Sequence, residues 1–253
     1  MGVDGGTMTE KPLHGRTALV TGASRGIGAA TAEALAAAGA HVVLTARTPG
    51  ALEEIEDRIH DAGGTATLAP LDLTDGDSIG RLASAIAGRW SSLDILVLNA
   101  AMLGTLSPVT AIDAKEFSRV LTMNVGAQQA LLGAFDPLLK ASDSASVIGV
   151  TSSVGARPRA YWGAYGASKA AFETLLLAYA EEVRNISGIR IAIVDPGATA
   201  TAMRQRAYPG EDQSTLQQPK VPAEAIVRMI REGFRTGFRL RVAGSQRDSQ
   251  EAV

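Results

Sequence analysis

Short apolar runs rich in β-branched residues alternate along the chain with longer segments of helical character. A short last strand is expected near 238–242, and six earlier runs are predicted as strands: 17–20, 41–46, 65–73, 93–100, 145–152 and 189–195. Runs that are apolar on both faces and alternate with helices are typical of a parallel sheet covered on both sides. The pattern therefore predicts an α/β fold with one doubly wound parallel sheet and helices on both faces.

Several helix ends carry local signals. Thr48 is predicted as an N-cap, with Pro49 at the first helical position. A long helix is expected from Asp113, which has the capping-box spacing to Glu116. This helix is expected to reach about residue 140, with a kink near Gly126.

A chain of 253 residues fits one large domain of this class. We expect that domain, which would bind a dinucleotide and carry out catalysis, to cover residues 13–245. Residues 1–12 are predicted to be a disordered lead and residues 246–253 a C-terminal tail. A polar, flexible substrate loop is expected at about 198–220.

The composition excludes several kinds of chemistry. The chain has no cysteine, so it has no disulfide, thiolate nucleophile or zinc ribbon. His14, His41 and His60 are too few and too scattered for the usual metal sites or a Ser-His-Asp triad. A net charge of -2 removes the basis for tight nucleic-acid binding, and no apolar run reaches the roughly 18 residues of a membrane span. We expect a cytoplasmic protein with no metal, nucleic-acid or membrane partner.

The segment TGASRGIG at 21–28 lies where the first strand passes into a helix. Its glycines, Gly22, Gly26 and Gly28, permit a tight turn, close approach to a pyrophosphate and close packing of helix on strand. The N–H groups and the positive end of the helix would then hold the phosphate. An ordinary strand-to-helix turn is the alternative. The position after the first strand of an alternating pattern favours a Rossmann-like dinucleotide site.

The ends of the second and third strands bear on which dinucleotide is bound. Arg47 occupies the place where an acidic residue would hold the ribose 2′-hydroxyl of NAD. Arg47 and Arg25 can instead bind a 2′-phosphate, which favours NADP(H) over NAD(H); two solvated surface arginines are the alternative. Asp72 is expected to accept a hydrogen bond from the adenine amino group, to cap a helix, or both.

Tyr165 and Lys169 are four residues apart in the segment YGASK. On a helix, residues at this spacing share a face, so the ammonium group can lie beneath the phenol. A nearby positive charge favours the phenolate and lowers the pKa of a tyrosine from about 10. The pair predicts a tyrosine that is usable as an acid or base near neutral pH. A surface contact between a tyrosine and a lysine is the alternative.

In combination, these motifs resemble those of the short-chain dehydrogenase/reductase family. TGASRGIG, LDLTD, LNAA, MNVG, TSSVG, YGASK and DPGATAT occur in the order and spacing of that family between residues 13 and 203. The resemblance implies that Ser152, which lies 13 residues before Tyr165 in a Ser-x-x-Gly pattern, is catalytic together with Tyr165 and Lys169.

The resemblance also assigns the polar neighbours of this set. It implies that Asn124 is the fourth catalytic residue, where a helix distortion lets it hold a water linked to the catalytic lysine. A buried polar side chain that only kinks the helix is the alternative. Thr151 and Ser153 are expected to be hydroxyls that bond the backbone. Tyr161 is excluded because Tyr165, not a lysine, follows it by four residues.

The family likeness extends to a set of cofactor contacts. The stretch 196–201 resembles the segment that cups the nicotinamide. Asn99 and Ala100 resemble the segment under the adenine ribose, although Leu-Asn-Ala-Ala replaces the usual Asn-Asn-Ala-Gly. The expected cofactor contacts are Gly22, Ser24, Arg25, Gly26, Ile27, Gly28, Arg47, Asp72, Leu73, Asn99, Ala100, Tyr165, Lys169, Pro196, Gly197, Thr199 and Thr201.

The expected function is an NADP(H)-dependent oxidoreductase that interconverts a carbonyl and an alcohol of a small-molecule substrate by hydride transfer. The alternatives are a nucleotide-binding regulator without catalysis and an isomerase or dehydratase that uses the same cofactor site. Met102, Leu103 and Trp162 are expected to line the mouth of the pocket. Arg204 and Arg206 are interpreted as part of a solvated charged loop in preference to an anion site.

The resemblance implies a homodimer or homotetramer, because family members commonly pair through the long helices, here around 113–140 and 163–187. The chain departs from the family at its C-terminus. It reads FRLRVAGSQRDSQEAV from residue 238, where many members have Val-Asp-Gly-Gly. This departure weakens any transfer of their quaternary arrangement.

Overall fold

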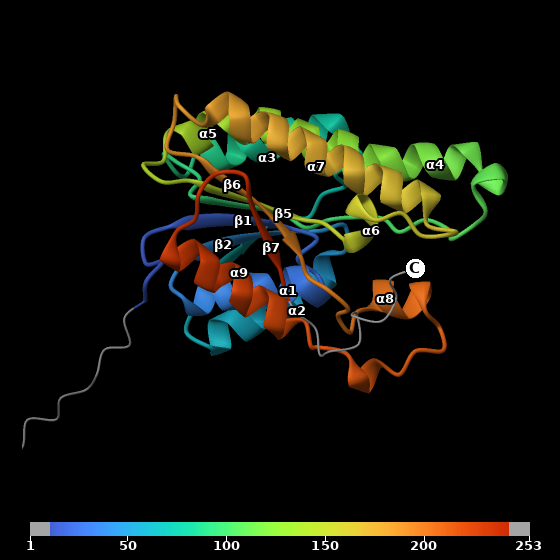
Figure 1. The fold of residues 1–253 in the computed structure, drawn as a ribbon. Coiled ribbons are helices and arrows are strands. Elements are labelled where there is room, and N and C mark those ends of the chain that lie inside the picture. The colour runs from blue at the N-terminus through green and yellow to red at the C-terminus, as the bar shows by residue number, and fades with distance from the viewer. Residues whose placement is uncertain (1–10, 243–253) are drawn as a thin grey trace, which may run out of the picture.

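A computed structural model of the protein describes residues 11–242, which form a seven-stranded sheet. The strand order is β3-β2-β1-β4-β5-β6-β7, and all neighbouring strands are parallel (Figure 1). The strands are β1 Thr17–Thr21, β2 His41–Thr45, β3 Thr65–Leu68, β4 Ile95–Leu98, β5 Ser146–Val150, β6 Arg190–Asp195 and β7 Phe238–Arg241. The predicted doubly wound parallel sheet is confirmed.

Helices cover both faces of the sheet. Helices α3, α4, α5 and α7 lie over one face, α1, α2 and α9 lie over the other, and α6 and α8 lie at one end (Figure 1). The helices are α1 Gly26–Ala37, α2 Pro49–Asp61, α3 Gly76–Ala87, α4 Ala114–Leu121, α5 Ala127–Lys140, α6 Ser153–Ala156, α7 Gly163–Val183, α8 Ala202–Ala207 and α9 Lys220–Glu232. A π-helical turn, η2, spans Thr122–Gly126, and 3-10 turns are η1 Val109–Ala111 and η3 Gln213–Thr215.

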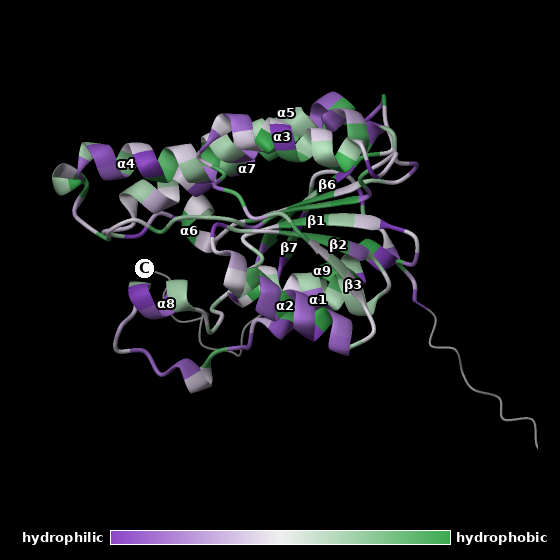
Figure 2. Ribbon diagram, turned by 180° about the vertical axis from the view of Figure 1, so that it is seen from behind, coloured by the Kyte–Doolittle hydropathy of each residue, from purple (hydrophilic) through white to green (hydrophobic). Residues whose placement is uncertain are grey.

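Two hydrophobic cores lie between the sheet and these helices. The residues of strand β4 are all apolar because both of its faces are buried. Ile95 and Val97 pack into the core that contains residues of α1 and α9. Leu96 and Leu98 pack into the other core with Phe135. Burial of one such side chain contributes about 1.5–3 kcal/mol. Figure 2 shows the hydrophobic strands between helices that carry both hydrophilic and hydrophobic residues.

The winding of the chain reverses between β1 and β4. From β1 the chain proceeds outward to β2 and β3, and then returns to place β4 on the other side of β1. At such a reversal, the loops that leave the two strands diverge and open a crevice at their carboxyl ends. The segments after Thr21 and after Leu98 therefore border one crevice.

The third strand is shorter than predicted. It ends at Leu68, so the prediction of a strand over 69–73 is wrong. The N–H groups of Ala69 and Leu71 still bond the carbonyls of Leu44 and Ala46. Pro70 between them has no N–H to donate, and the ladder does not continue into the turn beyond it.

The expected kink in the long helix is a π-helical turn. At the start of the helix, only one of the two hydrogen bonds of a capping box is formed. The Asp113 side chain accepts a hydrogen bond from the Glu116 N–H at 2.8 Å, but the Glu116 carboxylate accepts one from Thr105 Oγ1 at 3.0 Å. Thr48 does occupy the N-cap of α2, although its side chain makes no capping hydrogen bond. The capping box is incomplete because the Glu116 side chain has Thr105 as its partner.

The N-terminal boundary differs from the prediction by two residues. Residues 11 and 12, assigned to the lead, belong to a turn in which Lys11 Nζ donates to the Gly63 carbonyl at 3.1 Å and Leu13 is buried. Residues 1–10 and the predicted tail at 246–253 lie outside the described residues. Within residues 11–242, no helix has both the length and the apolar character needed to cross a bilayer.

Candidate active site

The turn between β1 and α1 has a backbone that glycine adopts readily. Gly22 and Gly26 have φ values of +66° and +58°, in the left-handed region. Arg25 is the N-cap of α1 and makes no capping hydrogen bond through its side chain. The N–H groups of the first helical turn are therefore not occupied by a capping residue, as a phosphate site at a helix N-terminus requires.

Gly28 lies where the turn is most crowded. A Cβ atom at this position would be 2.2 Å from the Gly22 carbonyl oxygen and 2.4 Å from Asn99 Nδ2. Asn99 Nδ2 in turn donates to the carbonyls of Thr21 at 2.9 Å and Gly22 at 3.2 Å, and the Ala100 N–H donates to Thr21 Oγ1 at 3.1 Å. The Asn99 side chain thus braces the glycine turn, and this compact turn fits the pyrophosphate of a dinucleotide.

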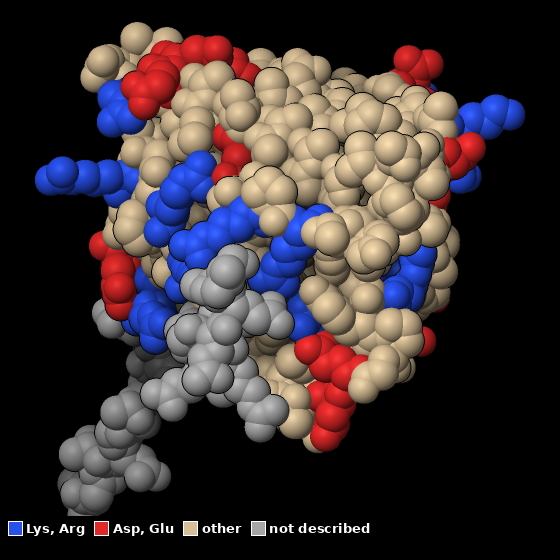
Figure 3. Space-filling model, turned by 45° about the vertical axis from the view of Figure 1, so that its right-hand side comes forward, with Lys and Arg blue, Asp and Glu red and all other residues tan. Residues whose placement is uncertain are grey.

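The two arginines expected at a 2′-phosphate are both exposed. Arg25 lines a cleft beside α1 together with Ser24 and Gly26. Arg47 lies close enough to Asp72 for its charge to help lower the pKa of that carboxyl, after the larger effect of hydrogen bonds from Thr74. Figure 3 shows Lys and Arg side chains gathered on the face that includes the α8 end of the molecule. This local positive charge suits an anionic ligand, although the net charge of the chain is slightly negative.

One alternative considered for Asp72 is wrong. The N-cap of helix α3 is Asp75, whose side chain accepts from the Asp77 N–H. Asp72 instead accepts from the N–H of Thr74 at 2.9 Å and from its hydroxyl at 2.7 Å. Asp72 therefore fixes the turn before the helix and does not cap the helix itself.

Tyr165 and Lys169 are both buried at the start of α7. Their exposed fractions are 6% and 3%, and Lys169 Nζ lies 5.8 Å from the centre of the Tyr165 ring. The ammonium group donates to the carbonyl of Val150, the last residue of β5, at 2.8 Å. Burial and this anchorage exclude a solvent-exposed tyrosine–lysine contact.

The acid–base properties of the pair differ from those that the spacing predicts. Burial raises the pKa of Tyr165 well above its ordinary value, and the negative charge of Asp195 raises it further. Burial lowers the pKa of Lys169 to about 8, against the opposing effect of Glu173. The prediction of a lowered tyrosine pKa is thus wrong, because burial and the negative charge of Asp195 raise it. The phenol is protonated at neutral pH, the form that a proton donor needs.

Asn124 lies in the π-helical turn and is 1% exposed. Its Oδ1 accepts from the Met102 N–H at 2.7 Å, and its Nδ2 donates to the Met102 carbonyl at 2.8 Å and to Ser168 Oγ at 2.9 Å. Ser168 Oγ donates to the Tyr165 carbonyl at 2.7 Å. Asn124 therefore joins the segment after β4 to the helix that carries Tyr165 and Lys169.

Ser152 follows β5 and is the N-cap of α6, which packs against the first turns of α7. The prediction for its neighbour Thr151 is wrong: the Thr151 hydroxyl donates to the carboxylate of Glu173 at 2.6 Å, not to the backbone. Tyr161, excluded by its spacing, is 59% exposed and has a φ of +71°. The structure thus brings the Ser152 segment, and not Tyr161, to the buried start of α7.

The segment after β6 is held by its own hydrogen bonds. Gln217 Nε2 donates to the Pro196 carbonyl and, at 3.1 Å, to Thr199 Oγ1. The Gly197 N–H donates to Asp195 Oδ1 at 3.1 Å, and Thr201 Oγ1 accepts from the Arg204 N–H at 3.1 Å as the N-cap of α8. The residues expected at the nicotinamide therefore begin a structured loop at the carboxyl end of β6.

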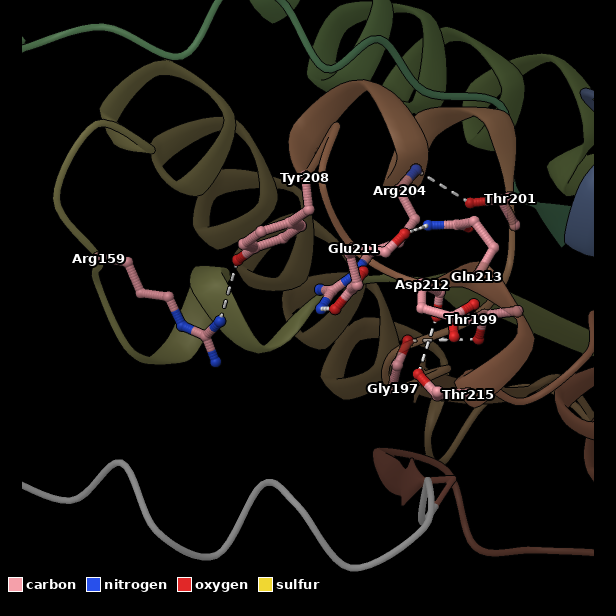
Figure 4. Close-up of polar contacts among 10 residues, drawn as sticks. All are labelled: Arg159, Gly197, Thr199, Thr201, Arg204, Tyr208, Glu211, Asp212, Gln213 and Thr215. Carbon is pink, nitrogen blue, oxygen red and sulfur yellow. Dashed lines mark hydrogen bonds and ion pairs between the residues drawn. The ribbon is translucent and has the colours of Figure 1, made fainter.

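An ion pair links two parts of the expected substrate loop. Arg204 Nε and Nη2 donate to the Glu211 carboxylate at 2.6 Å and 2.5 Å, and its guanidinium carbon lies 3.9 Å from the centre of the Tyr208 ring (Figure 4). The interpretation of Arg204 as a solvated side chain is wrong, because the chain folds back to pair it with Glu211 and only 24% of the side chain is exposed. The flexibility of the loop stays a prediction. Arg206 remains exposed.

A small apolar cluster borders the tyrosine. Leu103 and Val154 are buried with Tyr165, and Trp162 and Met203 pack against them. The ring centroids of Trp162 lie 5.9 Å from Tyr165 and 5.7 Å from Tyr208. Leu103 and Trp162 thus lie beside Tyr165, and Met102 contributes backbone groups that bond Asn124. That these three residues line the mouth of the pocket stays a prediction.

Sequence reasoning missed four polar residues of this region: Gln217, Tyr208, Glu211 and Glu173. The first three lie in or after a segment that has no periodic pattern, so no local signal marks them. Glu173 is marked only by its spacing of four residues from Lys169. Within residues 11–242, no group of three or more His, Asp or Glu side chains is placed to hold a metal ion.

Several known proteins are similar to this chain in sequence and fold. Residues 16–212 match the family profile of short chain dehydrogenases. The chain is 36% identical over 210 residues to the oxidoreductase YciK of Escherichia coli K12, covering 82% of each protein. A short chain dehydrogenase structure from Pseudomonas syringae is 37% identical, with a TM-score of 0.89 over 92% of this chain and 97% of that one. A crystal structure from Escherichia coli CFT073, complexed with NADPH, is 34% identical, with a TM-score of 0.85 over 92% and 98% of the two chains.

The matched profile covers the glycine turn, the π-helical turn and the start of α7, and extends into the loop after β6. Each of these two structures aligns with most of this chain, and more than a third of the sequence is identical. The protein belongs to the short-chain dehydrogenase/reductase family of oxidoreductases.

Proposed function

We propose that this oxidoreductase uses NADP(H) and interconverts a carbonyl and an alcohol, with Tyr165 as the general acid or base. The observation that carries the proposal is the buried pair of Tyr165 and Lys169 at the start of α7, next to the Ser152 segment. The NADPH in a structure that resembles this chain supports the choice of cofactor.

In the reducing direction, Ser152 would hydrogen-bond the carbonyl oxygen and Tyr165 would donate its proton to the same atom. The Lys169 ammonium would stabilise the phenolate that remains, at a site where burial otherwise disfavours the anion. When bound, the nicotinamide supplies or accepts the hydride. Asn124 would support proton transfer by fixing α7 against the Met102 segment; its link to a water stays a prediction.

The cofactor would lie along the crevice between the segments after β1 and β4. The turn that contains Gly22, Gly26 and Gly28 would hold the pyrophosphate, and Arg47 with Arg25 would bind the 2′-phosphate. The remaining predicted contacts follow the same edge of the sheet from Ser24 and Ile27 to Leu73 and to the stretch 196–201.

Arg47 gives a direct test of cofactor preference. Arg47→Ala should raise the Kd for NADPH by at least about tenfold, because it removes a charge-assisted hydrogen bond to the 2′-phosphate. The Kd for NADH should change far less, since that ligand lacks the phosphate. Fluorescence titration with both dinucleotides measures the difference. Arg81→Ala, which changes an exposed arginine of α3, is the control, and an equal loss for both dinucleotides would refute the phosphate role.

A spectrophotometric assay of NADPH oxidation against a panel of ketones tests the activity. We expect oxidation with at least one ketone and one equivalent of alcohol formed per NADPH. Tight NADPH binding without turnover on any ketone would indicate a regulator, and product without net NADPH consumption would indicate an isomerase or dehydratase. A cytoplasmic location and a homodimer or homotetramer stay predictions, the second of which light scattering tests.

A further inference from the structure

A third buried polar group continues the row of Tyr165 and Lys169 along α7. Glu173 is 6% exposed and follows Lys169 by four residues, as Lys169 follows Tyr165. Residues at this spacing share a helix face, so a phenol, an ammonium group and a carboxylate lie in sequence. A buried carboxylate is costly unless it is paired. The proposed reaction does not use Glu173, so its presence needs another explanation.

Both oxygens of the Glu173 carboxylate have partners. Oε1 accepts from Thr151 Oγ1 at 2.6 Å, and Oε2 accepts from Arg239 Nη1 at 2.6 Å. Thr151 immediately precedes Ser152, and Arg239 belongs to the edge strand β7. One side chain therefore joins α7, the Ser152 segment and the last strand of the sheet.

The packing around Gly155 depends on the same carboxylate. A Cβ atom at Gly155 would be 3.2 Å from Glu173 Oε1 and 3.2 Å from the backbone nitrogen of Ala170. A larger residue at this position would therefore require α6 or its neighbours to shift by a few tenths of an ångström. The glycine of the Ser-x-x-Gly pattern thus permits the close approach that lets Thr151 reach Glu173.

We propose that Glu173 is a positioning residue, which holds the Ser152 segment and the edge strand β7 against the helix that carries Tyr165 and Lys169. The proposal rests on the proposed function, because the role of Lys169 belongs to that function. Arg239 would be the outer partner that holds the carboxylate in place. The Arg239 side chain is 51% exposed and the side chain of Glu173 alone is 8% exposed, so water screens the charge of the arginine more.

The charges around Lys169 give the proposal a measurable consequence. Burial lowers the pKa of Lys169 to about 8, and the negative charge of Glu173 opposes this effect. The ammonium charge is present below that pKa and is lost as the pH rises through it. Without the Glu173 charge, nothing opposes the effect of burial on the Lys169 pKa, so the lysine loses its charge at lower pH. The other titratable or charged groups that line this region are Tyr165 of α7, Asp195 of β6, and Arg239 and Arg241 of β7.

The pH dependence of kcat/KM for ketone reduction tests this consequence. In Glu173→Gln, the alkaline limb of the profile should move down by about one pH unit, because the lysine loses its negative neighbour. Arg239→Met is the matched control: it removes the other member of the ion pair and leaves the carboxylate charge, so the limb should not move down. A carboxylate with only a structural role would lower activity at every pH and leave the limb in place, which would overturn the proposal.

A second readout does not depend on turnover. NMR titration of protein labelled at the lysine side chains follows five lysines, and Lys169→Met assigns the signal of Lys169. We expect a lower lysine pKa in Glu173→Gln and also in the double variant E173Q/R239M, which leaves no unpaired arginine to impair folding. An unchanged lysine pKa in both variants would overturn the proposal. A lowered pKa in a protein that reduces no ketone would refute the proposed function and leave the charge effect of Glu173 established.

Discussion

Replacing Tyr165 by phenylalanine should lower kcat/KM for ketone reduction by about a thousandfold, because general acid catalysis contributes roughly 10²–10⁴-fold. The substitution removes the only proton that the proposed mechanism transfers from the protein. The ring keeps its packing against Leu103, Val154 and Trp162, so the fold should persist. Steady-state NADPH oxidation measures the loss, and fluorescence titration should show NADPH binding close to that of the parent.

Tyr161→Phe is the matched control for this experiment. It makes the same chemical change four residues upstream, at a side chain that is 59% exposed, and it should leave turnover near that of the parent. Near-normal turnover in Tyr165→Phe would contradict the assignment of the proton donor. Equal losses in both variants would show that the tyrosine hydroxyls at and just before the start of α7 matter for a reason other than proton transfer.

Gly28→Ala should abolish measurable NADPH binding. The new Cβ would lie 2.2 Å from a backbone oxygen of the same turn, an atom that cannot move aside as the end of a side chain can. The turn would have to open, which separates the groups expected to hold the pyrophosphate. Overpacking of this kind also costs about 1–3 kcal/mol of stability. Calorimetric titration with NADPH and thermal unfolding measure the two effects.

Gly80→Ala is the corresponding control. Gly80 lies on helix α3, and a Cβ atom there meets nothing within 4 Å. Alanine is favoured over glycine in a helix by about 1 kcal/mol, so this variant should be slightly more stable and should bind NADPH as the parent does. Undiminished NADPH binding by a folded Gly28→Ala variant would mean that the cofactor does not lie against this turn.

The sheet was predictable because of how its strands are buried. A parallel strand between two layers of helices must be apolar on both faces. A short run such as Ile95–Leu98, in which every residue is apolar, is therefore sufficient to predict a strand. The ends of strands depend on less local facts, such as where Pro70 interrupts the ladder. Helix periodicity predicted the helix around Gly126. The distortion at Asn124 was predicted only from the family resemblance, because an extra residue in one turn is invisible to a pattern with a period of 3.6.

The candidate site was predictable where its groups are close in sequence and unpredictable where they are not. The spacing of Tyr165 and Lys169 was sufficient to find them. It could not reveal that burial dominates their pKa values, because burial is decided by residues such as Leu103 and Val154 from other segments. Arg204 is a similar case: its polar neighbours suggested solvent, whereas Glu211 pairs with it only after the chain turns back.

The Gln217 side chain closes the segment after β6 at its base. It bonds Pro196 and Thr199, and Thr199 also forms a backbone bridge with Gln217. The two ends of the chain between these points are therefore held together, so a change in its length costs little additional loop-closure entropy and leaves β6 in register. Loops exchanged between relatives at Thr199 and Gln217 should transfer substrate preference without a change in the sheet. The hydrogen bonds of Gln217 therefore mark a suitable junction for the design of chimeric enzymes.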